Sequence, residues 1–89
     1  MAWRIEWDEQ ALKELRKLGA SAARDVIDYL RKRIAVADSP RRFGKALTSD
    51  KKGLWRYRVG DYRIVCRIED DALIVLVVRI GHRSKVYDK

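Results

Sequence analysis

Residues 54–68 read LWRYRVGDYRIVCRI, and this stretch decides the fold. Two runs that alternate apolar and polar residues flank Gly60-Asp61, and a two-residue loop with glycine first is typical of a tight β-hairpin. Such a loop also sets the register between the two strands. The expected pairs are Val59 with Tyr62, Arg58 with Arg63, Tyr57 with Ile64, Arg56 with Val65, and Trp55 with Cys66.

The alternation sorts the side chains of this hairpin onto two faces. One face is apolar and is expected to pack against helices; it carries Trp55, Tyr57, Ile64, Cys66 and Ile68. The other face carries Arg56, Arg58, Arg63, Val65 and Arg67. Arg58 and Arg63 then oppose each other directly, which costs about 0.2–1 kcal/mol relative to a neutral pair. A phosphate bound between the two guanidinium groups would make this pair favourable; the alternative is a face of solvated arginines.

The net charge of +8 on 89 residues is concentrated around the hairpin. Residues 40–67 hold nine basic groups and two acids, and such a block indicates a polyanionic partner, most often nucleic acid. One cysteine and one histidine exclude an internal disulfide and a zinc cluster of the usual Cys/His composition. The N-terminus lacks a signal-peptide core and every apolar run is too short for a bilayer, so we expect one cytoplasmic domain, residues 1–89, without membrane contact.

The segments before the hairpin predict a strand and two helices. Residues 3–7 alternate as a strand with one buried face. Two helices with apolar stripes follow, capped by Asp8 and Ser21 and separated by a turn at Gly19. The stripes are Ala11, Leu12, Leu15 and Leu18 in the first helix and Ala23, Val26, Ile27, Leu30 and Ile34 in the second. The short turn predicts an antiparallel helical hairpin that ends before Pro40.

The remaining segments complete an α+β pattern. Residues 39–53 show no period and are interpreted as a basic loop, either a solvated connector or a functional segment. After the β-hairpin and a turn at 69–71, residues 73–80 form an apolar interior strand that ends at Gly81, and residues 85–87 form a short final strand. The predicted fold is an N-terminal strand, a two-helix hairpin and an antiparallel β-meander, with the helices packed on one sheet face.

Three segments resemble the RelE-type toxins of the RelE/ParE superfamily: WDEQALKEL (residues 7–15), GLWRYRVGDYRIV (53–65) and IGHRSKVY (80–87). The resemblance implies a RelE-like fold and a toxin of a type II toxin–antitoxin module. It also implies a ribosome-dependent endoribonuclease that cuts the mRNA codon in the A site. The ribose 2′-hydroxyl attacks the adjacent phosphate and leaves a 2′,3′-cyclic phosphate, without a metal or another cofactor.

The resemblance and the charge pattern together give a set of candidate site residues. The candidate catalytic residues are Arg56, Arg58, Arg63, Arg83 and Tyr87. The candidate RNA-binding residues are Lys45, Lys51, Lys52 and His82. Arg83 would stabilise charge on the phosphorane, and Tyr87 would stack on the target base. Arginine is a poor general base, so the proton acceptor is open between Tyr87 and His82.

The resemblance also implies partners and alternatives. An antitoxin with an amphipathic, acidic segment would wrap the basic face, the ribosome and mRNA would be the targets, and operator DNA would be contacted indirectly through the antitoxin complex. In the ParE branch the same fold inhibits DNA gyrase without nuclease activity. A third hypothesis is an RNA-binding module without chemistry, for which binding would be sensitive to salt.

Overall fold

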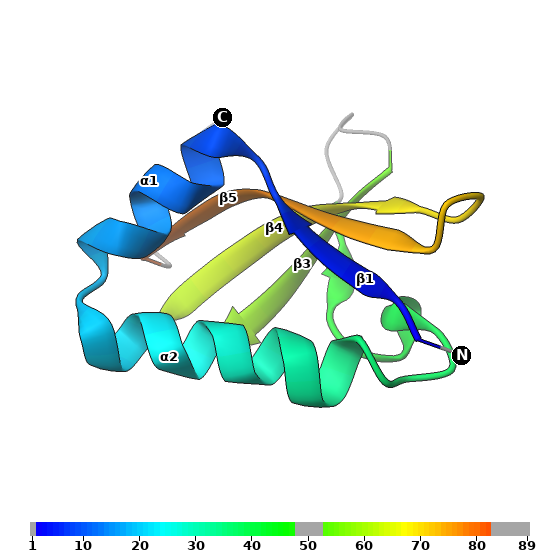
Figure 1. Ribbon diagram of the computed structural model, residues 1–89, viewed down its shortest axis with the longest axis horizontal. Coiled ribbons are helices and arrows are strands. Elements are labelled where there is room, and N and C mark those ends of the chain that lie inside the picture. Colours follow the sequence, from blue (N-terminus) through cyan, green and yellow to red (C-terminus); the bar gives the residue numbers. More distant parts are fainter. Residues whose placement is uncertain (1, 48–52, 83–89) are drawn as a thin grey trace.

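The computed structural model describes residues 2–47 and 53–82, which form a five-stranded mixed sheet with two helices on one face (Figure 1). In chain order the elements are β1 (Arg4–Trp7), α1 (Glu9–Lys17), α2 (Ala20–Tyr29), a π-helical turn (Leu30–Ile34), a 3-10 turn (Pro40–Arg42), β2 (Lys45–Ala46), β3 (Leu54–Val59), β4 (Tyr62–Glu69) and β5 (Ile74–His82). The strand order is β1-β5-β4-β3-β2. β1 runs parallel to β5, and the other pairs are antiparallel. The predicted α+β fold is confirmed.

The two helices form a hairpin that opens away from its short connection (Figure 1). Asp8 precedes α1 as predicted, but its side chain makes no capping hydrogen bond. The predicted cap at Ser21 is wrong, because α2 begins at Ala20, two residues earlier than a cap at Ser21 implies, and Gly19 holds the cap position with a φ of 90°. Only glycine adopts this φ without strain, so Gly19 both ends α1 and starts α2. The carbonyl oxygen of Gly19 accepts the first helical hydrogen bond, from the amide of Ala23 at 3.0 Å.

The second helix ends in a π-helical turn that sequence periodicity does not indicate. The amide of Ala35 donates to the carbonyl oxygen of Leu30 at 2.8 Å, a bond that spans five residues. Leu30 and Ile34 nevertheless both have 0% exposure, as the apolar stripe predicted. None of the helices in the described ranges has the length and apolar character needed to cross a bilayer.

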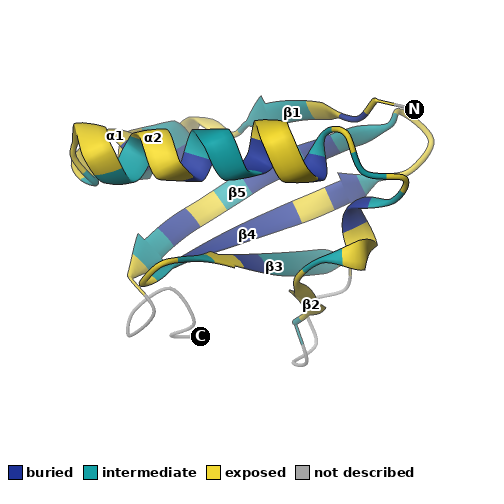
Figure 2. Ribbon diagram, turned by 90° about the horizontal axis from the view of Figure 1, so that it is seen from below, coloured by how far each residue is buried: buried dark blue, intermediate teal, exposed yellow. Residues whose placement is uncertain are grey.

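The core lies between the helices and one face of the sheet (Figure 2). Tyr57, Ile64 and Cys66 each have 0% exposure there, and Trp55 packs against them. All five predicted hairpin pairs are present. Loop chemistry and alternation therefore predicted both the register and the buried face.

β5 is an interior strand, as predicted, but it does not end at Gly81. Gly81 pairs with Arg63 and His82 pairs with Tyr62, because β4 continues the ladder to its own first residue. The pairing also shifts: Cys66 faces Val77 whereas Val65 faces Arg79, so one residue of β5 bulges out. The final strand predicted at 85–87 lies outside the described residues.

Part of the expected loop 39–53 is ordered against the sheet. β2 pairs with β3, with Lys45 opposite Arg56 and Ala46 opposite Trp55. The predicted irregularity is wrong there because a strand of two residues has no detectable period. Gly44 has a φ of 75°, and a Cβ at this position would collide with the backbone of β3 at Arg56. Close approach and backbone conformation both require glycine at position 44.

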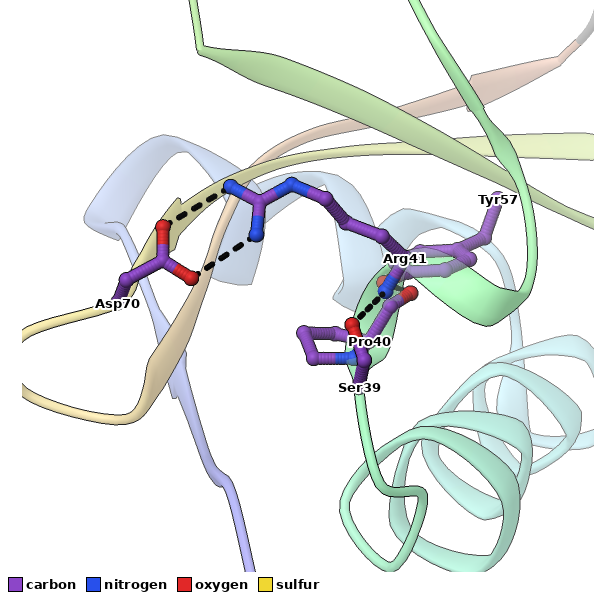
Figure 3. A network of polar contacts seen from close by, with 5 residues as sticks. All are labelled: Ser39, Pro40, Arg41, Tyr57 and Asp70. Carbon is purple, nitrogen blue, oxygen red and sulfur yellow. Dashed lines mark hydrogen bonds and ion pairs between the residues drawn. The ribbon is translucent and has the colours of Figure 1, made fainter.

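Polar contacts fix the start of the same segment (Figure 3). The buried hydroxyl of Tyr57 donates to the carbonyl oxygen of Pro40 at 2.6 Å, and Ser39 Oγ accepts the amide of Arg41 at 3.2 Å. The Arg41 guanidinium donates to both carboxylate oxygens of Asp70, at 2.9 and 3.0 Å. The hydrogen bond lowers the pKa of Asp70 and raises that of Arg41. Residues 39–46 are thus an anchored part of the fold rather than a solvated connector.

Candidate nucleic-acid interface

The sheet face turned away from the helices gathers basic side chains from three neighbouring strands. We call the following set the basic face: Lys45 on β2, Arg56 and Arg58 on β3, and Arg63 and Arg67 on β4. Lys45 lies opposite Arg56, and Arg58 lies opposite Arg63. The structure therefore brings together four of the residues that the sequence singled out. β2 supplies one of them through a pairing that the sequence did not predict.

The members of the basic face differ in exposure. Arg58 and Arg67 are exposed and Arg56 is half-buried, whereas Arg63 is only 9% exposed. The Nε and Nη1 atoms of Arg63 are both buried. The alternative of a uniformly solvated arginine face is therefore wrong at Arg63. A charge held at low exposure acts in a lower effective dielectric, where it attracts an anion more strongly than a solvated charge does.

Strands rather than loops hold the paired cations. Arg63 lies on β4, the central strand, between Arg58 on one side and Gly81 on the other. Gly81 places no side chain of its own beside Arg63 on this face. Two guanidinium groups on directly opposed strand positions can bind one phosphate and stabilise added negative charge on it.

The single histidine lies apart from this arrangement. His82 shares the side of β5 that carries Ile80, which belongs to the core beneath the helices. Its ring packs edge-on against Tyr62, with centroids 6.0 Å apart. The structure therefore does not bring His82 to the basic face, although His82 is exposed. Counting the alternation onward from Ile80 would have shown this, once the strand was extended past Gly81.

The family model described as the ParE toxin of the type II toxin–antitoxin system parDE matches residues 5–87. The chain belongs to the RelE/ParE superfamily of toxins. Among curated relatives, the mRNA interferase toxin RelE of Escherichia coli K12 is 34% identical to this RelE-type toxin over 97 residues, which cover 100% of this chain and 94% of the relative. Toxin RelG of Mycobacterium tuberculosis is 29% identical over 90 residues, 98% of each chain.

Solved structures agree with this assignment. The M. tuberculosis toxin–antitoxin complex RelBE2 contains a chain that superposes on the toxin with a TM-score of 0.84 and 26% identity, covering 96% of this chain and 95% of that one. The isolated E. coli RelE toxin gives a TM-score of 0.72 and 27% identity, with 97% and 92% covered. The RelE-like fold expected from the sequence is confirmed.

Four candidate residues of this toxin, Lys51, Lys52, Arg83 and Tyr87, lie outside the described residues. Their roles stay predictions. Arg67 was expected on this face but was left out of the candidate set, and the structure places it on β4 within the basic face. Its cross-strand neighbours are Leu54 and Leu76, so it is an exposed cation on the basic face without an opposed like charge. The alternation of β4 was the signal that placed it there.

Proposed function

We propose that this toxin is a ribosome-dependent endoribonuclease that cuts mRNA in the ribosomal A site. The ribose 2′-oxygen attacks the adjacent phosphorus, the bond from phosphorus to the 5′-oxygen breaks, and the products are a 2′,3′-cyclic phosphate and a 5′-hydroxyl. The observation that carries the proposal is the direct opposition of Arg58 and Arg63 on a strand-built face. Relatives that are named mRNA interferases support it.

The basic face suits the charge that this reaction develops. The phosphorane intermediate carries more negative charge than the ground-state diester, and fixed guanidinium forks can offset the difference without rearranging. Arg58 and Arg63 take this role, while Arg56 and Lys45 bind the flanking backbone. Guanidinium groups supply the compensating charge, so the proposed reaction needs no metal ion.

Proton transfer needs a group other than arginine. With His82 on the opposite sheet face, we assign proton transfer to Tyr87: its phenolate takes the proton of the 2′-hydroxyl, and the resulting phenol donates that proton to the departing 5′-oxygen. We assign to Arg83 stabilisation of the phosphorane. Lys51 and Lys52 extend the contact with RNA. Unstructured mRNA does not hold one phosphate in the geometry needed for attack by the 2′-hydroxyl. We assign this positioning of the mRNA to the ribosome.

The same face defines the partner that would silence the toxin. We propose an antitoxin whose amphipathic, acidic segment covers the basic face by coupled folding and binding. The toxin–antitoxin complex RelBE2 of M. tuberculosis, which contains a chain similar to this one, supports an antitoxin partner. Contact with operator DNA would be indirect, through the antitoxin, and the ribosomal target places the toxin in the cytoplasm.

Primer extension on mRNA after brief induction tests the proposal. We expect cuts within codons for the wild type and none for Arg63→Lys, which keeps the charge of the buried side chain but removes its fork. Arg16→Ala, which removes an exposed arginine from α1, is the matched control and should cut normally. A folded Arg63→Lys variant with undiminished cutting would contradict the proposal.

A second candidate function rests on the family model, which is that of the ParE toxins. In that branch the toxin would inhibit DNA gyrase without cutting RNA. Gyrase supercoiling assays with purified toxin distinguish the two. Inhibited supercoiling together with intact mRNA on ribosomes would favour the second function. Salt-sensitive RNA binding without either effect would indicate a binding module.

A further inference from the structure

Glu14 on α1 holds the outer edge of β5 where β1 no longer does. The pairing of β1 with β5 ends at Trp7 and Val77, and the chain then turns into α1. Further along that edge, Glu14 Oε1 accepts the backbone amide of Ile80 at 2.7 Å. A side-chain carboxylate thus takes the place of a neighbouring strand.

Two further groups hold this carboxylate in place. Glu14 Oε2 accepts a hydrogen bond from Arg79 Nε at 3.0 Å and another from Gln10 Nε2 at 3.2 Å. The Glu14 side chain is only 15% exposed, whereas that of Arg79 is 52% exposed. A half-exposed ion pair contributes little by itself, but a charge-assisted bond to a backbone amide at low exposure is among the stronger ones.

This link lies at the irregular part of β5. The bulge falls between the residues paired with Cys66 and Val65, and a bulged strand bends and loses regular pairing at that point. Immediately after it, Ile80 pairs with Ile64 and Gly81 pairs with Arg63. The amide that Glu14 holds is therefore one residue from the position beside the buried arginine of the basic face.

We propose that Glu14 is a positioning residue for Arg63. It fixes the bulged end of β5 against α1 and so sets where β5 lies beside the Arg63 side chain. This role rests on the proposed nuclease function, because its consequence is the placement of a guanidinium group over the reacting phosphate. Glu14 itself touches neither RNA nor the reacting atoms, since it lies on the helix side of the molecule.

The test compares four variants in cleavage of mRNA on programmed ribosomes with purified toxin. Glu14→Ala should lower kcat by about 10- to 100-fold with little change in KM, since misplacement by about 1 Å can cost that much. Glu14→Gln keeps an acceptor for the Ile80 amide and should recover kcat to within about 3-fold of wild type. Glu14→Met fills the same space without an acceptor. If the alanine variant does not fold, the kcat of Glu14→Met is compared with that of the wild type instead. Glu9→Ala changes the net charge equally on the same helix and should cut normally.

Amide exchange on the free toxin, followed by NMR, gives a readout that needs no ribosome. The Ile80 amide should exchange faster in Glu14→Ala and Glu14→Met than in the wild type, and Glu14→Gln should restore its protection. Faster exchange with undiminished kcat would overturn the positioning role and leave the proposed function intact. The positioning role would also be overturned if the kcat of Glu14→Gln were as low as that of Glu14→Met. A wild type that leaves mRNA intact on ribosomes would refute the proposed function, and with it the positioning role of Glu14 in cleavage.

Discussion

Replacing Arg58 with threonine should stabilise the fold while it disables the toxin. Arg58 and Arg63 are directly opposed on neighbouring antiparallel strands, and such like charges cost about 0.2–1 kcal/mol relative to a neutral pair. Threonine suits an exposed strand position, so Arg58→Thr removes the repulsion without loss of strand propensity. We expect the free energy of unfolding to rise by about 0.5 kcal/mol, the middle of that range, and Tm to rise by about 2–4 °C.

Arg67→Thr is the matched control for this change. Arg67 is exposed on the same face, but its cross-strand neighbours are Leu54 and Leu76. This variant loses the same charge and gains the same strand propensity without relieving an opposed like charge. The difference in unfolding free energy between the two variants isolates the repulsion between Arg58 and Arg63.

Urea unfolding at low ionic strength and in about 1 M NaCl measures this difference, because about 1 M salt shortens the Debye length to roughly 3 Å. We expect the advantage of Arg58→Thr to shrink at high salt. In parallel, mRNA cleavage by Arg58→Thr should fall by about 100- to 1,000-fold, the usual effect of removing one donor to a developing charge. If Arg58→Thr is no more stable than Arg67→Thr at low salt, the opposed guanidinium groups do not repel, and the physical argument for an anion site fails.

Three further predictions concern the core and the segment anchored to it. Tyr57→Phe removes the donor to the carbonyl oxygen of Pro40 and should lower the unfolding free energy by about 1–3 kcal/mol in urea titrations. Gly44→Ala should cost more stability than Gly53→Ala in the same titrations, because both glycines have a φ of 75° but only the first lies against the β3 backbone; equal losses would count against the tight approach. Burial raises the pKa of Cys66 and of Tyr57, so the folded state holds their protons to higher pH than the unfolded state. Stability should therefore be fully present below about pH 9 and fall above it by up to about 1.4 kcal/mol per pH unit for each group, and Cys66→Ala should move the onset towards pH 10.

The hairpin could be predicted from the sequence because its determinants are local. A two-residue loop sets the register, and the alternation then decides which side of the sheet each residue faces. The apolar stripes of the helices are local in the same sense, and they identified Val26, Leu30 and Ile34 as core residues. Each of these predictions needs only the sequence within one or two adjacent elements.

Features that depend on distant segments could not be predicted in this way. The parallel pairing of β1 with β5 joins residues about seventy positions apart, and no local pattern encodes it. β2 is too short to show a period, so Lys45 was placed on the basic face only by its pairing with Arg56. The burial of Arg63 was also missed, because alternation gives the direction of a side chain and not what covers it. His82 was grouped with the site through its sequence position beside Arg83, although strand geometry turns it to the other face.

The two sides of β4 explain how the fold can keep cations close together before any ligand binds. Ile64 and Cys66 point into the core with 0% exposure, and burying a side chain of the size of isoleucine contributes about 1.5–3 kcal/mol. That exceeds the cost of one opposed pair of arginines, so the apolar side fixes the strand while the basic side stays under repulsion. An anion then meets charges that are already in position, and binding relieves the repulsion instead of requiring the sheet to rearrange. A partner that silences this surface must therefore cover the cations or displace β5 beside them, since their spacing is built into the sheet.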